Sequence, residues 1–163
     1  MHMPNDETRT PKSTEVITRE VVMPQHANPQ QTLFGGQMVC WIDMVAGMAA
    51  RRHACGPIVT ASIDNLSFTE PVFVGDILLL QAKVNYVGRT SMEVGVKVSV
   101  EHLYTGQFTP VTRAYLTFVA LDENRRPRPV PRLRCETEDD KRRYDNGRMR
   151  MEARKDLVRR LAG

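Results

Sequence analysis

The sequence predicts an α+β fold in which one long central helix is wrapped by a curved antiparallel sheet of about five or six strands. The helix is indicated by residues 37–53, which lack proline, contain one glycine and are apolar on nearly every side. One strand-like segment precedes this helix and four follow it, joined by short links that suit antiparallel neighbours. Because the helix has no polar face, a single small sheet cannot bury it, and we expect a second subunit to complete its surroundings.

The strands are predicted from short apolar or alternating runs that end at residues favouring turns. Residues 91–101 show the clearest period of two, because one methionine and four valines face one way and mostly charged or polar residues face the other. The expected strands are residues 15–23, 58–68, 76–87, 91–101 and 109–121.

The length of 163 residues fits one domain. We expect a loose leader at residues 1–13, the folded domain at residues 14–133 and a charged, helical tail at residues 134–163. The net charge is +4, but the tail holds 10 basic and 7 acidic residues, so the body is nearly neutral. This distribution is the reverse of a basic nucleic-acid-binding domain.

Three cysteines, Cys40, Cys55 and Cys135, are too few for a rich disulfide framework and lack the spacing of a zinc site. The N-terminal residues are polar, unlike a signal peptide, and the longest apolar run is too short to span a bilayer. We therefore expect a cytoplasmic protein with reduced thiols that requires no metal or other cofactor and binds neither nucleic acid nor membrane.

Asp43 is the only charged residue between Gly36 and Ala50, near the middle of the expected helix. Burying a lone carboxylate costs several kcal/mol unless it is paired, hydrogen-bonded or protonated. We therefore expect Asp43 to face a polar pocket or a subunit boundary. A structural aspartate bonded to a backbone amide or an arginine fits the composition equally well.

Gly35 and Gly36 open this helix, so a ligand can approach the first N–H groups at the positive end of the helix dipole. This arrangement favours an oxyanion hole, although a plain N-terminal turn has the same residues. Asn28 lies in a proline-bounded loop and by itself indicates a turn. His53 is expected to add positive charge at the C-terminal end of the helix.

The stretch HANPQQTLFGGQMVCWID at residues 26–43 resembles the hotdog-fold acyl-CoA thioesterases of the cytosolic acyl-CoA hydrolase type, which include small bacterial acyl-CoA hydrolases and the vertebrate brain enzyme. The resemblance covers residues 15–133, with Gln31 where the family usually has glycine. Further matching stretches follow in the same order: TASIDNLSF (60–68), PVFVGD (71–76), VGRTSMEV (87–94), FVALD (118–122) and PVP (129–131).

The resemblance implies a hotdog fold whose units pair, with active sites at the dimer interface and often three dimers in a hexamer. The implied reaction is hydrolysis of acyl-CoA to free fatty acid and CoA. Asp43 would be the catalytic carboxylate, acting as base or nucleophile, and Asn28 of the other subunit would position the water or the thioester. A backbone N–H at Gly35 or Gly36 would polarise the carbonyl group.

The resemblance also implies where the substrate binds. Thr60 and Ser62 would line the cleft, with Asp64 as a further member. Arg126 belongs to an arginine-rich exit arm, residues 122–133, that would meet the 3′-phosphate of CoA, although a solvated arm fits as well. The nucleotide and pantetheine would be held by one turn, formed by Arg89, Thr90, Ser91 and Met92.

Two other functions fit a hotdog domain. One is a non-catalytic regulator that senses acyl-CoA and acts through the basic tail, but the combination of Asn28 and Asp43 argues against it. The other is a dehydratase, which would need a histidine at the site. His26 is the only histidine near Asn28, and it has no evident pairing with Asp43.

Overall fold

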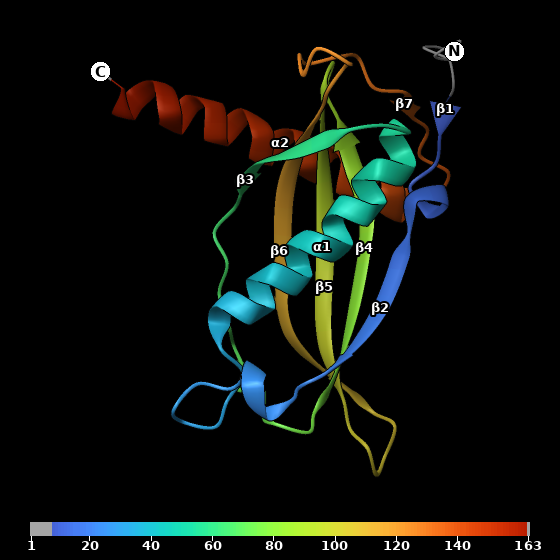
Figure 1. Ribbon diagram of the computed structural model, residues 1–163. Coiled ribbons are helices and arrows are strands. Elements are labelled where there is room, and N and C mark those ends of the chain that lie inside the picture. Colours follow the sequence, from blue (N-terminus) through green and yellow to red (C-terminus); the bar gives the residue numbers. More distant parts are fainter. Residues whose placement is uncertain (1–7, 163) are drawn as a thin grey trace.

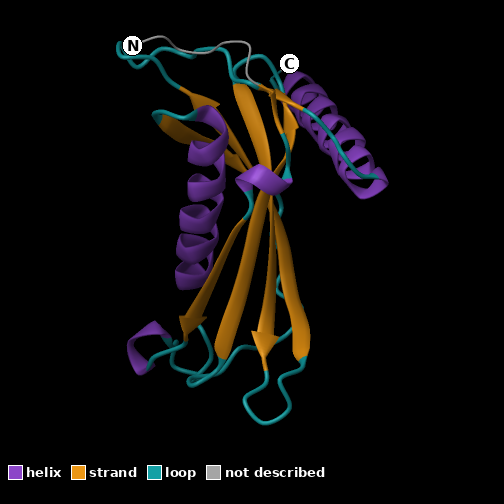
Figure 2. Ribbon diagram, turned by 90° about the vertical axis from the view of Figure 1, so that its right-hand side faces the viewer, coloured by secondary structure: helices purple, strands orange, loops and turns teal. Residues whose placement is uncertain are grey.

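The computed structural model describes residues 8–162. A curved five-stranded antiparallel sheet in the order β2-β4-β5-β6-β3 has helix α1 against one face and helix α2 against the other (Figure 1, Figure 2). The α+β fold, with a long helix against a curved antiparallel sheet and a charged C-terminal helix, is therefore confirmed. The elements of these layers are α1 (Gly35–Ala54), α2 (Glu138–Leu161), β2 (Val16–Val21), β3 (Ile58–Ile63), β4 (Ile77–Val87), β5 (Ser91–Glu101) and β6 (Phe108–Ala120).

The core lies between α1 and the concave face of the sheet. On β5 the expected alternation is confirmed, because its one methionine and its four valines are all buried. The opposite face of β5 is partly buried as well, since Glu93 is 2% exposed beneath α2. Helix α2 thus accounts for the burial of Glu93, which the alternation of β5 places on the face away from the core.

Helix α1 begins at Gly35, two residues before the expected start, and ends at Ala54. Cys55 follows in a left-handed conformation with φ of +50°, which stops the helix. The guanidinium of Arg128 donates a 2.7 Å hydrogen bond to the Ala54 carbonyl oxygen. Arg128 therefore caps α1, because the last carbonyl groups of a helix have no partner within it.

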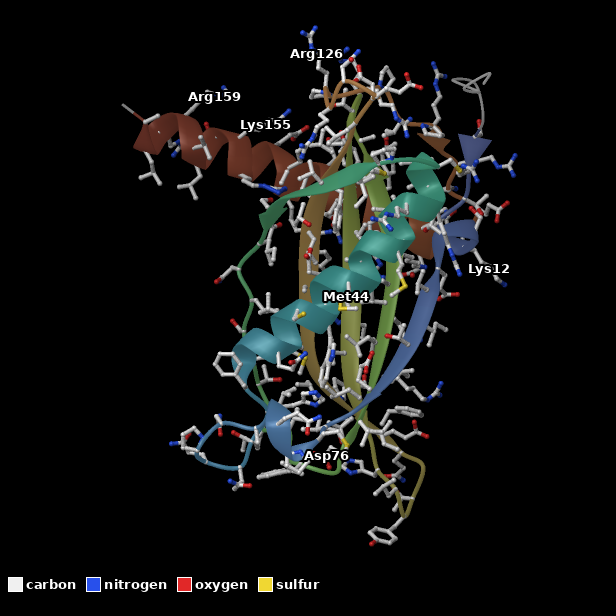
Figure 3. All side chains as sticks on the ribbon, viewed as in Figure 1. Lys12, Met44, Asp76, Arg126, Lys155 and Arg159 are labelled. Atoms are coloured by element: carbon white, nitrogen blue, oxygen red, sulfur yellow. The ribbon has the colours of Figure 1, made fainter. Side chains whose placement is uncertain are left out.

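One side of α1 lies open in the single chain. Met44 and Met48 are 55% and 43% exposed, and Figure 3 shows Met44 on the side of α1 away from the sheet. Beside this side runs β3, an edge strand that pairs only with β6. It ends at Ile63, earlier than the expected residue 68, and Val59 and Ile63 on it are exposed. The open helix side and the free strand edge form one continuous uncovered surface.

The expected loose leader is corrected for residues 8–13, while residues 1–7 lie outside the described residues. Strand β1 (Thr8–Arg9) pairs in parallel with β7 (Arg132–Leu133). A short 3₁₀ helix, η1 (Lys12–Thr14), follows. Its Thr14 is fully buried, and the Thr14 hydroxyl accepts a 3.0 Å hydrogen bond from the N–H of Val84. These backbone and hydroxyl contacts attach the segment to the domain.

Helix α2 crosses the convex face of the sheet and begins with a capping box, in which Thr137 and Asp140 each accept a hydrogen bond from the other's N–H. Gly147 allows close contact, because a Cβ there would lie 2.7 Å from the Cβ of Tyr86. The last turns of α2 extend past β3 (Figure 1). Within residues 8–162, neither helix is both long and apolar enough to cross a membrane.

Candidate functional site

Asp43 lies on α1 where this helix meets the edge strand β3. The hydroxyl of Thr60 on β3 donates a 2.9 Å hydrogen bond to Oδ1 of Asp43. A pocket of about 410 Å³ surrounds the pair. Its other lining residues are Met44, Gly47, Met48, Arg51, Ile58 and Phe118.

The pocket combines a half-buried carboxylate with an apolar wall. Gly47, one turn after Asp43, leaves space on this side of the helix, and Arg51, one turn further, adds a cation. Arg51 was not among the expected site residues. Its spacing of eight residues from Asp43, about two helical turns, could have indicated that both lie on roughly the same side of the helix. The pocket opens onto the uncovered surface of α1 and β3.

Asn28 lies near the N-terminal end of α1, in the loop before the helix. Its Oδ1 accepts hydrogen bonds from the N–H groups of Gln30 and Thr32 at 3.0 and 3.2 Å, and its Nδ2 donates one of 2.9 Å to the Thr32 hydroxyl. Gln31, between them, has φ of +60°, a conformation that glycine adopts without steric cost. Gln31, where the resembled family usually has glycine, therefore occupies a position whose backbone conformation favours glycine. Within its own chain, Asn28 is a loop-ordering residue.

Gly35 and Gly36 form the first turn of α1. Their N–H groups have no acceptor within the helix, since the first four N–H groups of any helix lack one. A Cβ at Gly36 would overlap the ring of Phe34. Asp43 is seven residues further along, which is about 10 Å along the helix axis. One thioester carbonyl group cannot contact both Gly36 and Asp43 of the same chain over this distance.

The turn after β4 lies at the C-terminal end of α1. Its Arg89 and Thr90 carbonyl oxygens accept hydrogen bonds of 3.0 Å from the N–H groups of Val130 and Ala120. The bond from Ala120 joins the turn to the end of β6, and the bond from Val130 joins it to the exit arm that carries Arg126, which Figure 3 shows at this end of the molecule. The cations Arg89 and Arg126 are both exposed there, and Ser91, at the start of β5, is partly exposed.

Met92 does not belong to the exposed part of this turn. It is fully buried and pairs with Phe118 of β6. The strand alternation turns its side chain into the core, so its side chain does not reach a ligand at the turn. The expected contact of Met92 with substrate is corrected on this ground.

Ser62 and Asp64 are not brought to Asp43. A bulge in the pairing of β3 with β6 lies between Thr60 and Ser62 and changes the side to which the following residues point. The guanidinium of Arg154 on α2 donates a 2.7 Å hydrogen bond to the Ser62 hydroxyl and lies 3.1 Å from Asp64. Burial raises the pKa of Asp64, and the charge of Arg154 opposes that rise. Both residues thus anchor α2 on the convex face.

His53 is corrected as well. It is fully buried rather than solvent-facing, and its Nε2 lies 2.8 Å from the carbonyl oxygen of Pro131, to which it donates. Burial lowers the pKa of His53, so the side chain is neutral and does not act as a helix-end charge near neutral pH. Within residues 8–162, no three His, Cys, Asp or Glu residues are grouped as metal ligands.

Comparison with known proteins connects this geometry to a family. A family model described as "Thioesterase superfamily" matches residues 30–106. The chain is 44% identical over 138 residues to an uncharacterized acyl-CoA thioester hydrolase of Bacillus subtilis, YkhA, and the match covers 85% of this chain and 80% of that relative.

Solved structures agree with this match. An acyl-CoA hydrolase from Staphylococcus aureus, in complex with butyryl coenzyme A, coenzyme A and coenzyme A disulfide, is 35% identical with a TM-score of 0.88, covering 96% of this chain and 94% of the other. An apo-hexameric acyl-CoA thioesterase is 39% identical with a TM-score of 0.89, covering 93% and 97%. Alanine variants of the Staphylococcus aureus enzyme have also been solved, with an aspartate, an asparagine or a threonine replaced.

Proposed function

Because the chain belongs to the thioesterase superfamily and, within it, to the acyl-CoA thioester hydrolases, we propose that it hydrolyses acyl-CoA to a carboxylic acid and CoA at sites that two subunits build together. The observation that carries the two-subunit site is the pair of Asp43 and Thr60, which faces a pocket on the uncovered surface of α1 and β3. Asp43 is the catalytic carboxylate in this proposal, and Thr60 orients it.

The second subunit supplies the groups that one chain keeps too far apart. If β3 pairs with its own copy across a two-fold axis, both β3 and α1 run antiparallel to their copies. The first turn and the Asn28 loop of the partner then approach Asp43 from the other end of the paired helices. The roughly 10 Å between Gly36 and Asp43 within one chain supports this assignment. Asn28, Gly35 and Gly36 thus act on the substrate held at the Asp43 of the other subunit.

The proposed chemistry needs only these groups and water. Asp43 either takes a proton from the attacking water or attacks the carbonyl carbon itself, forming an anhydride that water then hydrolyses. In both routes the carbonyl oxygen becomes negative and is stabilised by N–H donors at Gly35 or Gly36. The carbon–sulfur bond breaks, and the CoA thiolate leaves and takes up a proton. No cofactor is required, and CoA enters as part of the substrate.

The CoA part of the substrate is proposed to lie across the turn and the exit arm. Arg89 and Arg126 give two exposed cations at this end, and Thr90 and Ser91 add hydroxyl donors. Arginine suits phosphate oxygens because its planar fork donates two parallel hydrogen bonds.

The assembly is proposed to be a hexamer built as a trimer of dimers. Its support is the hexameric thioesterase of the same fold, together with the apolar side of α1 that a single chain leaves uncovered. We place the reaction in the cytoplasm, which suits the three free cysteines.

Mixed assemblies test this proposal. Asp43→Asn and Asn28→Ala chains are each expected to lose at least about 100-fold in kcat, measured as thiol release from acyl-CoA. Co-expressed with different tags, the two chains form heterodimers in which one of two sites is intact, so random pairing restores about a quarter of the wild-type activity. If activity is not restored although mixed dimers are recovered, Asn28 and Asp43 act within one chain. Full activity of Asp43→Asn would contradict the catalytic role of this residue.

A further inference from the structure

We propose that the convex face of the sheet carries a second binding site, for a small phosphorylated anion, in a hollow between strands β4–β6 and the first half of α2. The hollow has a volume of about 280 Å³. It is separate from the site of Asp43, because α1 and α2 lie on opposite faces of the sheet (Figure 2).

Two cross-strand rows of residues form the floor of this hollow. In the first row, Gln81 of β4 lies opposite Lys97 of β5, and Lys97 lies opposite Arg113 of β6. The second row consists of Lys83, Gly95 and Tyr115.

Gly95, at the centre of the second row, lets the side chain of Asn85 lie against the floor of the hollow. A Cβ at this position would overlap the side-chain amide of the buried Asn85, so the row has no side chain at its centre. Arg143 of α2 closes one side of the hollow. The result is a concave surface with cationic side chains on several sides rather than a flat charged strip.

The charges around the hollow are unbalanced. Lys97 and Arg113 are exposed and directly opposite each other, and neither makes an ion pair within residues 8–162. Like charges in this cross-strand position destabilise a sheet. Lys83 and Arg143 are partly neutralised, because they pair with acidic residues of α2 at 3.6 and 2.6 Å. Glu15 is the single acidic residue among those that line the hollow.

An oxyanion between Lys97 and Arg113 would convert their repulsion into attraction. Arginine binds phosphate oxygens through its fork, and lysine binds them as a compact charge, so the two side chains together suit a phosphate group. Because the hollow is several times larger than one phosphate group, the ligand class is a small molecule that carries phosphate and a further polar part.

Thermal unfolding with inorganic pyrophosphate as the probe tests this site. Without the probe, Lys97→Gln/Arg113→Gln is expected to have a higher Tm than the wild-type protein, because the repulsion is removed. With the probe, the Tm of the wild-type protein rises, because binding to the folded state alone stabilises it. The Tm of the variant rises less, because only the proposed CoA end still binds pyrophosphate. Titration calorimetry is expected to show binding at least about tenfold weaker in the variant.

Two control variants separate site binding from general charge effects. Lys12→Gln/Arg159→Gln removes the same charge from exposed positions outside the hollow and should respond to pyrophosphate as the wild-type protein does (Figure 3). Arg89→Gln/Arg126→Gln should lose only the part of the response that comes from the proposed CoA end and keep the part that depends on Lys97 and Arg113. Equal responses of all variants would overturn the proposal. Loss of the oligomer in Lys97→Gln/Arg113→Gln, without any pyrophosphate effect in the wild-type protein, would assign this surface to subunit contact instead.

Discussion

The Thr60 hydroxyl on β3 holds the Asp43 carboxylate on α1 through a 2.9 Å hydrogen bond. The bond connects an edge strand to the uncovered side of the central helix, so it orients the carboxylate within the pocket on that side. By fixing the direction in which the carboxylate points, the bond prepares Asp43 for its proposed role as base or nucleophile.

Replacing Thr60 separates this orienting role from packing. Thr60→Val keeps the shape and removes the donor, so kcat is expected to fall by at least about tenfold, the value of one hydrogen bond to a charged group. KM should change little, because the bond contacts no CoA atom. Thr60→Ser keeps the hydroxyl and is the matched control, with kcat close to that of the wild-type protein in the thiol-release assay. Equal losses in both variants would indicate a packing role.

The anchoring of α2 is expected to depend on one buried ion pair. Arg150 donates to both carboxylate oxygens of Glu93, at 2.7 and 3.0 Å, and Glu93 is 2% exposed. Arg150→Met leaves that carboxylate buried without its partner, which should lower the free energy of unfolding by about 3 kcal/mol in denaturant titrations. Arg150→Met/Glu93→Gln should regain most of this loss. Arg148→Met, which removes an exposed pair with Asp145, is the control and should change stability by less than about 1 kcal/mol.

Stability is expected to depend on pH through His53. Burial lowers the pKa of the folded-state His53 below its ordinary value of about 6.5, so below that pH the unfolded chain binds more protons than the folded one. The contribution is fully present above pH 6.5 and is lost as the pH falls toward the lowered pKa. His53→Gln removes the titrating group. Denaturant titrations between pH 7.5 and 5 should therefore show a smaller loss of stability in this variant, and parallel curves would contradict the prediction.

Removing the projecting end of α2 distinguishes an enzyme from a regulator that acts through its tail. Leu157, Val158 and Leu161 on this end are 56%, 62% and 78% exposed, and the anchoring arginines of α2 precede it. Deleting residues 155–163 should leave kcat within about twofold of the wild-type value. Deleting residues 134–163 is the contrasting change and should destabilise the fold, because it uncovers Glu93.

The secondary structure could be predicted from the sequence because its signals are local. The period of two in residues 91–101 and the proline-free apolar run after Gly36 correctly predicted β5 and α1. A helix without a polar face also indicated a surface that one chain does not cover, and the exposed Met44 and Met48 confirm it. The local sequence pattern gave a wrong expectation for His53. Its side chain is bonded to Pro131 of the exit arm, a segment that lies far away in the sequence.

For the site, residue types and spacing indicated which groups could carry chemistry, because a lone carboxylate on an apolar helix is costly to bury without a polar partner. The paired glycines at the helix start fit a plain turn as well as an oxyanion hole. Only the tertiary structure decided which of these groups meet. A bulge one residue long brings Thr60 to Asp43 and directs Ser62 to the opposite face, and α2 then holds Ser62 through Arg154. Strand pairing and bulges depend on contacts between residues far apart in the chain, so the sequence by itself determined the candidate groups, and long-range packing decided which of them lie together.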